Sequence, residues 1–355
     1  MKYLYYCNSA YQVLTILNLN WHRKYANFEN IDDYNADIIL LNASEDMKEL
    51  ATNIQKLNDF NNVFLANKVK NIGAFHRLKS IYDVVNPYHY IEKSGISSIK
   101  NFINHYDVLT FPKFSKLTSS IYKINKSAKL DLYEDGLGSY NDEVQLESRR
   151  SIYPYLYKIL NYKSFCDFRY IYFNSLLLYN GCYRNVAKEI PNYDNGYITR
   201  INETFISSSL YKNKSILWLG QYLVDDVNEV TCNILQKYKN ISIYKQHPRY
   251  PMKANGLEIA TDKHAWEISV LNMEDINSKC LVTIYSTAAL SPKILFDYEP
   301  YIIFTYKLLK EKLSNKTIDA VDCFVKTYKN KNKIMIPNTI DDFQKCVELF
   351  IQKSN

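Results

Sequence analysis

Glu134 and Asp135 are adjacent acidic residues that directly precede a turn with Gly136 and Gly138. Two carboxylates in such a position could take part in proton transfer. Glycine lets the backbone approach a ligand closely, and a carboxylate can accept a proton or bind hydroxyl groups. An ordinary turn that uses Asp and Gly for local hydrogen bonds and for positive φ has the same sequence. Both interpretations stay open at this point.

His247 begins a second polar segment, since Pro248 follows it directly and Arg249 comes next. The proline restricts His247 to an extended or turn conformation, which holds its imidazole in place near the guanidinium of Arg249. Both groups can donate hydrogen bonds to a phosphate oxygen. A loop without function is the alternative, because a two-residue motif is weak evidence.

Ser286 and Thr287 form a third segment, between Tyr285 and a run of small helix-forming residues. A hydroxyl residue before such a run is typical of a helix N-cap, and the free N–H groups of a helix N-terminus bind anions. Capping alone is the simpler interpretation.

Three further acids could take part in a site. Asp225 and Asp226 follow an apolar run and open a helical stretch, where acids also serve as caps that favour the helix dipole. Glu267 follows Trp266 on another helical stretch and could accept hydrogen bonds from ribose hydroxyls. A solvated surface glutamate is the simpler interpretation of Glu267.

Short β-rich runs precede most of these segments and alternate with helical patterns, which predicts βα units around parallel sheets. Ligands of open parallel sheets bind beyond the carboxyl ends of the strands, where the polar segments lie. The expected strands cover residues 3–7, 37–41, 62–66, 106–111 and 129–133, and then 215–219, 241–244, 257–260, 280–284 and 301–304.

The alternation is interrupted over residues 149–204, which are rich in Tyr, Leu and Lys and predict helices followed by a turn. This interruption indicates a domain boundary near residues 195–213. We therefore expect an α/β fold with two Rossmann-like domains facing a central cleft. The N-terminal domain would cover residues 1–200, and the C-terminal domain residues 201–355.

The composition excludes several classes of protein. With 47% hydrophobic residues the chain is not disordered, and its seven scattered cysteines argue against a disulfide framework or a zinc site. No run reaches the roughly 18 apolar residues that a membrane-spanning helix needs, so we expect a cytoplasmic protein.

The net charge of +7 favours anionic partners, and the basic residues within 149–190 suit peripheral contact with an anionic membrane. Helices packed on the sheet are an equal alternative there.

The order of the segments resembles glycosyltransferase family 52. Its bacterial sialyltransferases carry an acid-Asp-Gly motif in the first domain, then His-Pro, then a Ser-containing turn of small residues. The matching residues here are 133–138, 246–249 and 285–290, and residues 7–14 resemble the family's first strand, turn and helix. The loop between Gly220 and Asp225 looks longer than in the family, which leaves Asp226 as an alternative to Asp225.

The resemblance implies a GT-B fold and transfer of sialic acid from CMP-sialic acid to a terminal galactose of lipooligosaccharide or capsule. Asp225 then matches the catalytic base, with His247 and Asp135 as the other catalytic candidates. The nucleotide would be bound by His247, Pro248, Arg249, Glu267, Tyr285, Ser286 and Thr287. The sugar side would be formed by Asn8, Ser9, Gln12, Glu134 and Gly136.

A single inverting displacement without a metal ion or other cofactor fits this donor, because a monophosphate leaving group bears little charge. A UDP-hexose-dependent glucosyl- or galactosyltransferase of the same fold is the alternative, followed by a non-catalytic sugar-nucleotide binder. A nucleic-acid partner is not expected, since the basic residues are spread along the chain. The acceptor, the linkage and the oligomeric state, a homodimer included, do not follow from the sequence.

Overall fold

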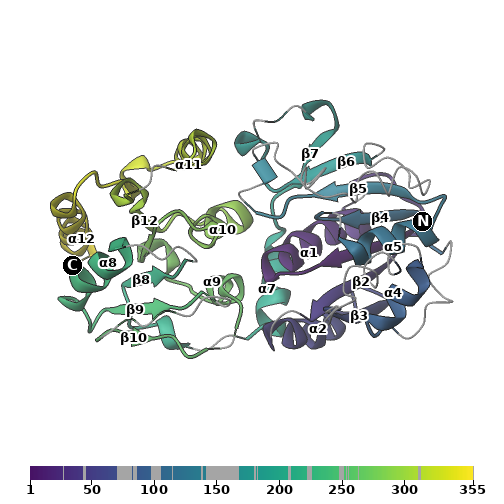
Figure 1. The fold of residues 1–355 in the computed structure, drawn as a ribbon, viewed down its shortest axis with the longest axis horizontal. Coiled ribbons are helices and arrows are strands. Elements are labelled where there is room, and N and C mark those ends of the chain that lie inside the picture. The colour runs from purple at the N-terminus through teal and green to yellow at the C-terminus, as the bar shows by residue number, and fades with distance from the viewer. Residues whose placement is uncertain are drawn as a thin grey trace. The chain divides into compact units, whose positions relative to one another are not determined.

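The computed structural model describes most of the chain as two compact units, Met1–Tyr193 and Asp194–Asn355, called here the first and the second unit. Each unit contains one parallel sheet flanked by helices (Figure 1). The described residues are 1–26, 28–42, 45–69, 82, 86–96, 105–113, 115–136, 139–140, 168–179, 181, 183–206, 209–221, 226–247, 252, 254, 256–262, 264–310 and 313–354.

The first unit has a seven-stranded sheet in the order β3-β2-β1-β4-β5-β6-β7. Its strands are β1 (Lys2–Cys7), β2 (Asn35–Asn42), β3 (Asn62–Asn67), β4 (Val108–Phe111), β5 (Lys129–Tyr133), β6 (Phe168–Phe173) and β7 (Ala187–Glu189). Its helices are α1 (Ala10–Tyr25), α2 (Glu45–Leu57), α4 (Pro87–Lys93), α5 (Lys116–Ile124) and the short 3₁₀ helices η3 (Leu176–Leu178) and η4 (Arg184–Val186).

β1 pairs with β2 on one side and β4 on the other, and its residues from Tyr3 to Cys7 are buried. A near-continuous apolar run is what a strand covered on both faces requires. The chain then turns at Asn8, and Ser9 caps α1 by accepting a hydrogen bond from the N–H of Gln12. The predicted strand, turn and helix at the N-terminus are confirmed.

Arg23 anchors the last turns of α1 to the sheet through buried charges. Its guanidinium donates to Asp131 Oδ2 at 2.9 Å and to the Tyr5 hydroxyl at 2.9 Å, and its Nε lies 3.2 Å from Glu29 Oε2. Asp131 also accepts hydrogen bonds from Arg169 at 3.0 and 2.7 Å. These hydrogen bonds join α1 to β1, β5 and β6. The side chains of Arg23 and Asp131 at the centre of the network are both fully buried.

The second unit has a six-stranded sheet in the order β10-β9-β8-β11-β12-β13. Its strands are β8 (Ile216–Leu219), β9 (Ser242–Lys245), β10 (Glu258–Ile259), β11 (Cys280–Thr283), β12 (Tyr301–Phe304) and β13 (Ile334–Met335). Its helices are α7 (Asn195–Thr204), α8 (Asp226–Gln236), α9 (Trp266–Leu271), α10 (Thr287–Phe296), α11 (Asn315–Thr327), α12 (Ile340–Ser354) and the 3₁₀ helices η5 (Ser209–Tyr211), η6 (Ile276–Ser278), η7 (Tyr306–Leu308) and η8 (Lys331–Lys333).

α12 packs against the second sheet through an apolar face. Phe343, Val347 and Phe350 recur at helical spacing on one face of the helix, and all three are fully buried in the same cluster as β8 and β11 side chains. The Phe350 ring packs edge-on against Tyr301 of β12, with 5.2 Å between the ring centres.

The predicted α/β class with two parallel sheets is confirmed, and the ten expected strands are present with ends shifted by at most two residues. The prediction of helical sequence before the turn in 149–204 is wrong over Phe168–Phe173 and Ala187–Glu189, because β6 and β7 extend the first sheet there. The sequence Phe168–Phe173 consists mainly of Tyr, Phe and Ile, which favour strands over helices. Residues 149–167 of the basic stretch lie outside the described residues.

Candidate functional site

Polar residues gather at the carboxyl edge of the first sheet. Asn8 follows β1, Glu134 follows β5 and Asn174 follows β6 directly, and Lys113 comes two residues after β4. The carboxyl ends of parallel strands meet at one edge, so segments far apart in the sequence become neighbours. The ligand-binding edge of the first unit therefore holds the predicted acidic motif.

Glu134 is fully buried at this edge. The Tyr11 hydroxyl and the Asn174 side-chain amide both donate to its Oε1, and Asn174 also donates to Thr15 Oγ1 at 2.9 Å. Its second oxygen, Oε2, is buried and has no hydrogen-bond partner in the part of the chain that the structure describes. A buried carboxyl oxygen without a partner is uncommon and indicates a group held ready for a ligand or a proton.

Burial raises the pKa of the Glu134 carboxyl to about 7, and the nearby charge of Asp135 also raises it. The hydrogen bonds from Tyr11 and Asn174 lower it in part. An acid with a pKa close to the ambient pH can both take up and release a proton in a reaction. This property makes Glu134 a candidate for proton transfer at this edge of the sheet.

Asp135 has a different environment. Its carboxylate accepts hydrogen bonds from the Gln12 amide and from the Lys113 ammonium, and the side chain is 24% exposed. Its N–H donates to Ser139 Oγ at 2.6 Å, and Gly136 has a φ of +98°, which glycine adopts without strain. Asp135 thus pairs with Lys113 and Gln12, and its backbone fixes the turn.

Gln12 connects this turn to the start of α1. Its Oε1 accepts from the Asn8 N–H at 2.7 Å, while its amide nitrogen donates to Asp135. The structure therefore brings together the predicted sugar-side residues Asn8, Ser9, Gln12, Glu134 and Gly136, with Asp135 among them. Sequence reasoning gave no role to Tyr11, Lys113 or Asn174. Tyr11 lay inside the matched N-terminal segment, whereas Asn174 follows a strand that the sequence did not predict.

At the carboxyl edge of the second sheet, the chain passes close to the end of β9 at Gly220, the residue directly after β8. A Cβ atom at this position would lie 2.6 Å from the Tyr244 hydroxyl and 3.0 Å from the backbone nitrogen of His247. Only glycine lets the ends of β8 and β9 approach so closely. His247 is half-buried there and belongs to this edge.

Gln221 links the end of β8 to the segment after β11. Its Oε1 accepts from the Tyr285 N–H at 2.9 Å and from Thr283 Oγ1 at 3.4 Å. Ser286 caps α10 by accepting from the Ala288 N–H at 3.2 Å, and Thr287 is the first residue of that helix. The predicted cap is confirmed, and an N-terminus of this kind suits an anion.

Glu267 lies in the first turn of α9, beside the start of α10. The neighbouring Trp266 donates from Nε1 to the Ala288 carbonyl at 2.6 Å, which ties the two helix starts together. Three of the predicted nucleotide-side positions, Glu267, Ser286 and Thr287, therefore lie in one region. Asp226 opens α8 and pairs with Lys310.

Asp225, Pro248 and Arg249 lie outside the described residues, so their roles stay predictions. Among the residues that are described, no group of three or more His, Cys, Asp or Glu side chains is placed to hold a metal ion. Within the same residues, no helix combines the length and the apolar character needed to cross a membrane.

The chain matches no protein-family model and no curated protein sequence. Solved structures do match its fold. A UDP-N-acetylglucosamine 2-epimerase aligns with 98% of this chain and 86% of its own, at 7% identity and a TM-score of 0.51. Arabidopsis thaliana UGT89C1 complexed with UDP aligns with 100% of this chain and 90% of its own, at 9% identity and a TM-score of 0.52. At such low identity the likeness shows the fold, which is GT-B.

Proposed function

We propose that the protein is an enzyme that uses a nucleotide sugar, and that it is a glycosyltransferase. The observation that carries this proposal is Glu134, a fully buried acid with a pKa of about 7 and one unused oxygen at the ligand-binding edge of a parallel sheet. Transfer of a sugar to a hydroxyl group needs a group that accepts the hydroxyl proton. The two structures of similar fold concern UDP or a UDP-sugar enzyme by name, which supports the nucleotide-sugar class.

The donor in this proposal is CMP-sialic acid, and the acceptor is a terminal galactose of a bacterial surface glycan. The order of the sequence segments supports this donor. The N-terminus of α10, with the Ser286 hydroxyl and the positive end of the helix dipole, also suits a monophosphate leaving group. These groups and His247 can stabilise a leaving group of low charge without a divalent ion.

The reaction is a single inverting displacement. The acceptor oxygen bonds to the anomeric carbon, the bond from that carbon to the phosphate oxygen breaks, and CMP leaves with the electron pair. Asp225 takes the hydroxyl proton according to the family resemblance, and Glu134 is the competing base according to its pKa. His247 donates to the departing phosphate, and Glu267 recognises the nucleoside.

A UDP-hexose-dependent transferase of the same fold is the second candidate, favoured by the UDP named for both similar structures. One preparation of the full chain, treated with excess EDTA, separates the two. We expect CMP release from CMP-sialic acid in the presence of a simple galactoside, and no UDP release from UDP-glucose or UDP-galactose. Robust UDP release without CMP release would replace the donor while keeping the transferase proposal. Absence of turnover with all three donors would contradict the proposed donors altogether.

A further inference from the structure

A pocket of about 300 Å³ lies in the second unit, away from the residues assigned to the nucleotide. Its lining comes from α7, from the end of α9 and the segment after it, and from the residues just before β12. Those segments precede β11 and β12, so the pocket lies at the amino edge of the sheet. The nucleotide-side residues follow β9 and β11 at the carboxyl edge, and the four residues of β11, about 13 Å of strand, separate the two.

Four polar side chains of this pocket have hydrogen-bonding capacity that the described residues do not use. The Asn202 side-chain oxygen is buried without a partner. Asn277 accepts from the Glu299 N–H at 2.6 Å through its oxygen, which leaves its amide nitrogen available. The Tyr298 hydroxyl and the Glu274 carboxylate complete the set. The buried Asn202 oxygen lacks a partner among the described residues and, with the other three groups, offers polar contacts to a ligand in the hollow.

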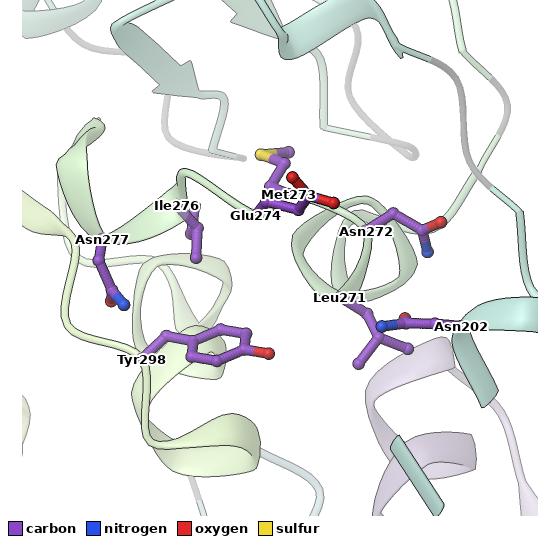
Figure 2. Close-up of a pocket in the computed structure, with 8 residues that line it drawn as sticks. All are labelled: Asn202, Leu271, Asn272, Met273, Glu274, Ile276, Asn277 and Tyr298. Atoms are coloured by element: carbon purple, nitrogen blue, oxygen red, sulfur yellow. The ribbon is translucent and has the colours of Figure 1, made fainter. Parts of the chain in front are cut away.

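Figure 2 shows that the side chains of Asn202 and Tyr298 point toward one another from opposite sides of the hollow, with Leu271 between them. The Tyr298 ring and Leu271 offer apolar surface to the face of a ligand. The amides, the phenol and the carboxylate offer both donors and acceptors to its rim. The lining residues include the acid Glu274 and, among those described, no lysine or arginine, which favours an uncharged ligand over an anion.

We propose that this pocket binds one uncharged sugar ring at a site separate from the donor site. A hexose presents hydroxyl groups that both donate and accept around its edge, and its C–H faces pack on aromatic and aliphatic side chains. The volume lies at the lower end of the range for small-ligand pockets, which suits a single ring. The inference goes beyond the proposed transfer reaction and does not depend on which nucleotide is bound.

Titration of the full chain with galactose, glucose and N-acetylglucosamine, followed by ligand-observed NMR, tests this site without any turnover. At least one of the sugars binds, and Asn202→Leu and Tyr298→Phe each weaken it about threefold to tenfold, as expected for one lost hydrogen bond. The control Asn240→Ala, at an exposed position outside the pocket, leaves the affinity unchanged. Saturating CMP or UDP also leaves the sugar bound.

Three results would overturn the proposal. They are no binding of any of the three sugars, binding to both pocket variants that is as tight as binding to the unmodified protein, or loss of the bound sugar on addition of nucleotide. Tyr298→Phe keeps the aromatic ring and is the deciding variant if Asn202→Leu does not fold. A chain that binds the sugar but turns over no donor would contradict the proposed function and leave this site standing.

Discussion

At the scale of a single residue, the Glu134 carboxyl makes the stability of the folded protein depend on pH in a definite direction. An unfolded glutamate loses its proton near a pKa of about 4.3, whereas burial raises the pKa of Glu134 in the folded chain to about 7. Between these values the folded state binds more protons than the unfolded state. The free energy of unfolding therefore falls as the pH rises through this window, by about 4 kcal/mol in total.

Glu134→Gln removes this pH dependence. Glutamine keeps an oxygen that accepts from Tyr11 and Asn174 but cannot ionise, so the variant gains stability relative to the parent as the pH rises. We expect the difference in unfolding free energy to grow by about 3 kcal/mol between pH 4.5 and 8, measured by urea denaturation. The exposed Glu203→Gln is the control and should show no such trend. A constant difference for Glu134→Gln at all pH values would contradict the raised pKa.

The catalytic base is identified by three single variants. Asp225→Asn should lower kcat by about 10²- to 10⁴-fold with nearly unchanged nucleotide affinity, as expected for loss of a general base. Glu134→Gln and Asp135→Asn are compared in the same assay. If Asp225→Asn keeps its activity while Glu134→Gln loses it, the base belongs to the first unit and the family match of Asp225 is wrong.

The sequence indicated which acids to consider, but not how their environments differ. Glu134 and Asp135 are adjacent, yet one is buried and the other is paired with Lys113. This difference depends on Asn174 and Tyr11, which reach Glu134 only because β6 lies beside β5 and α1 begins at the same edge. Spacing along one chain does not contain that neighbourhood.

At the scale of elements, the buried ion pair between α1 and β5 holds the helix whose first turn carries Gln12. Asp131→Asn leaves the Arg23 guanidinium buried with a weaker partner. Breaking such a pair costs about 3–5 kcal/mol, so we expect a loss of about 3 kcal/mol or more in unfolding free energy, measured in urea. The matched control is Asp275→Asn, because Asp275 is 51% exposed and pairs with Lys279 within one helical turn of sequence. Equally small losses in both variants would contradict the anchoring role.

Apolar runs predicted the elements well where a strand is bounded by turns. They failed for β6, whose aromatic residues lie inside a segment rich in Lys and Leu, and for β13, which has two residues. A strand of two residues has no measurable periodicity, and β10, which is equally short, was predicted only because it lies inside the β-rich run 257–260. Such elements are set by their neighbours in the sheet rather than by their own sequence.

At the scale of the whole molecule, α7 spans residue 200, where the sequence placed the end of the first domain. We propose that the second domain begins at Asp194, whose side chain caps α7 by accepting from the Tyr197 N–H at 3.0 Å. A chain of residues 194–355 should unfold in one cooperative transition. A chain of residues 201–355 loses the cap and the buried Tyr197 and should be less stable by about 3 kcal/mol or more. Urea denaturation followed by circular dichroism compares them, and equal midpoints would favour the boundary at 200.

The outermost strands of both sheets also bear on association between copies of the chain. An edge strand offers unpaired N–H and C=O groups to any strand of another molecule, and short edges limit this risk of aggregation. β10 and β13 have two residues each and β7 has three, so three of the four edges offer little to pair with. β3 has six residues, and the N–H of its last residue, Asn67, is occupied by the Ser94 carbonyl at 2.7 Å. Among the described strands, β3 is therefore where intermolecular pairing would begin, and Val63→Lys, at a half-buried position, is the substitution that would block it.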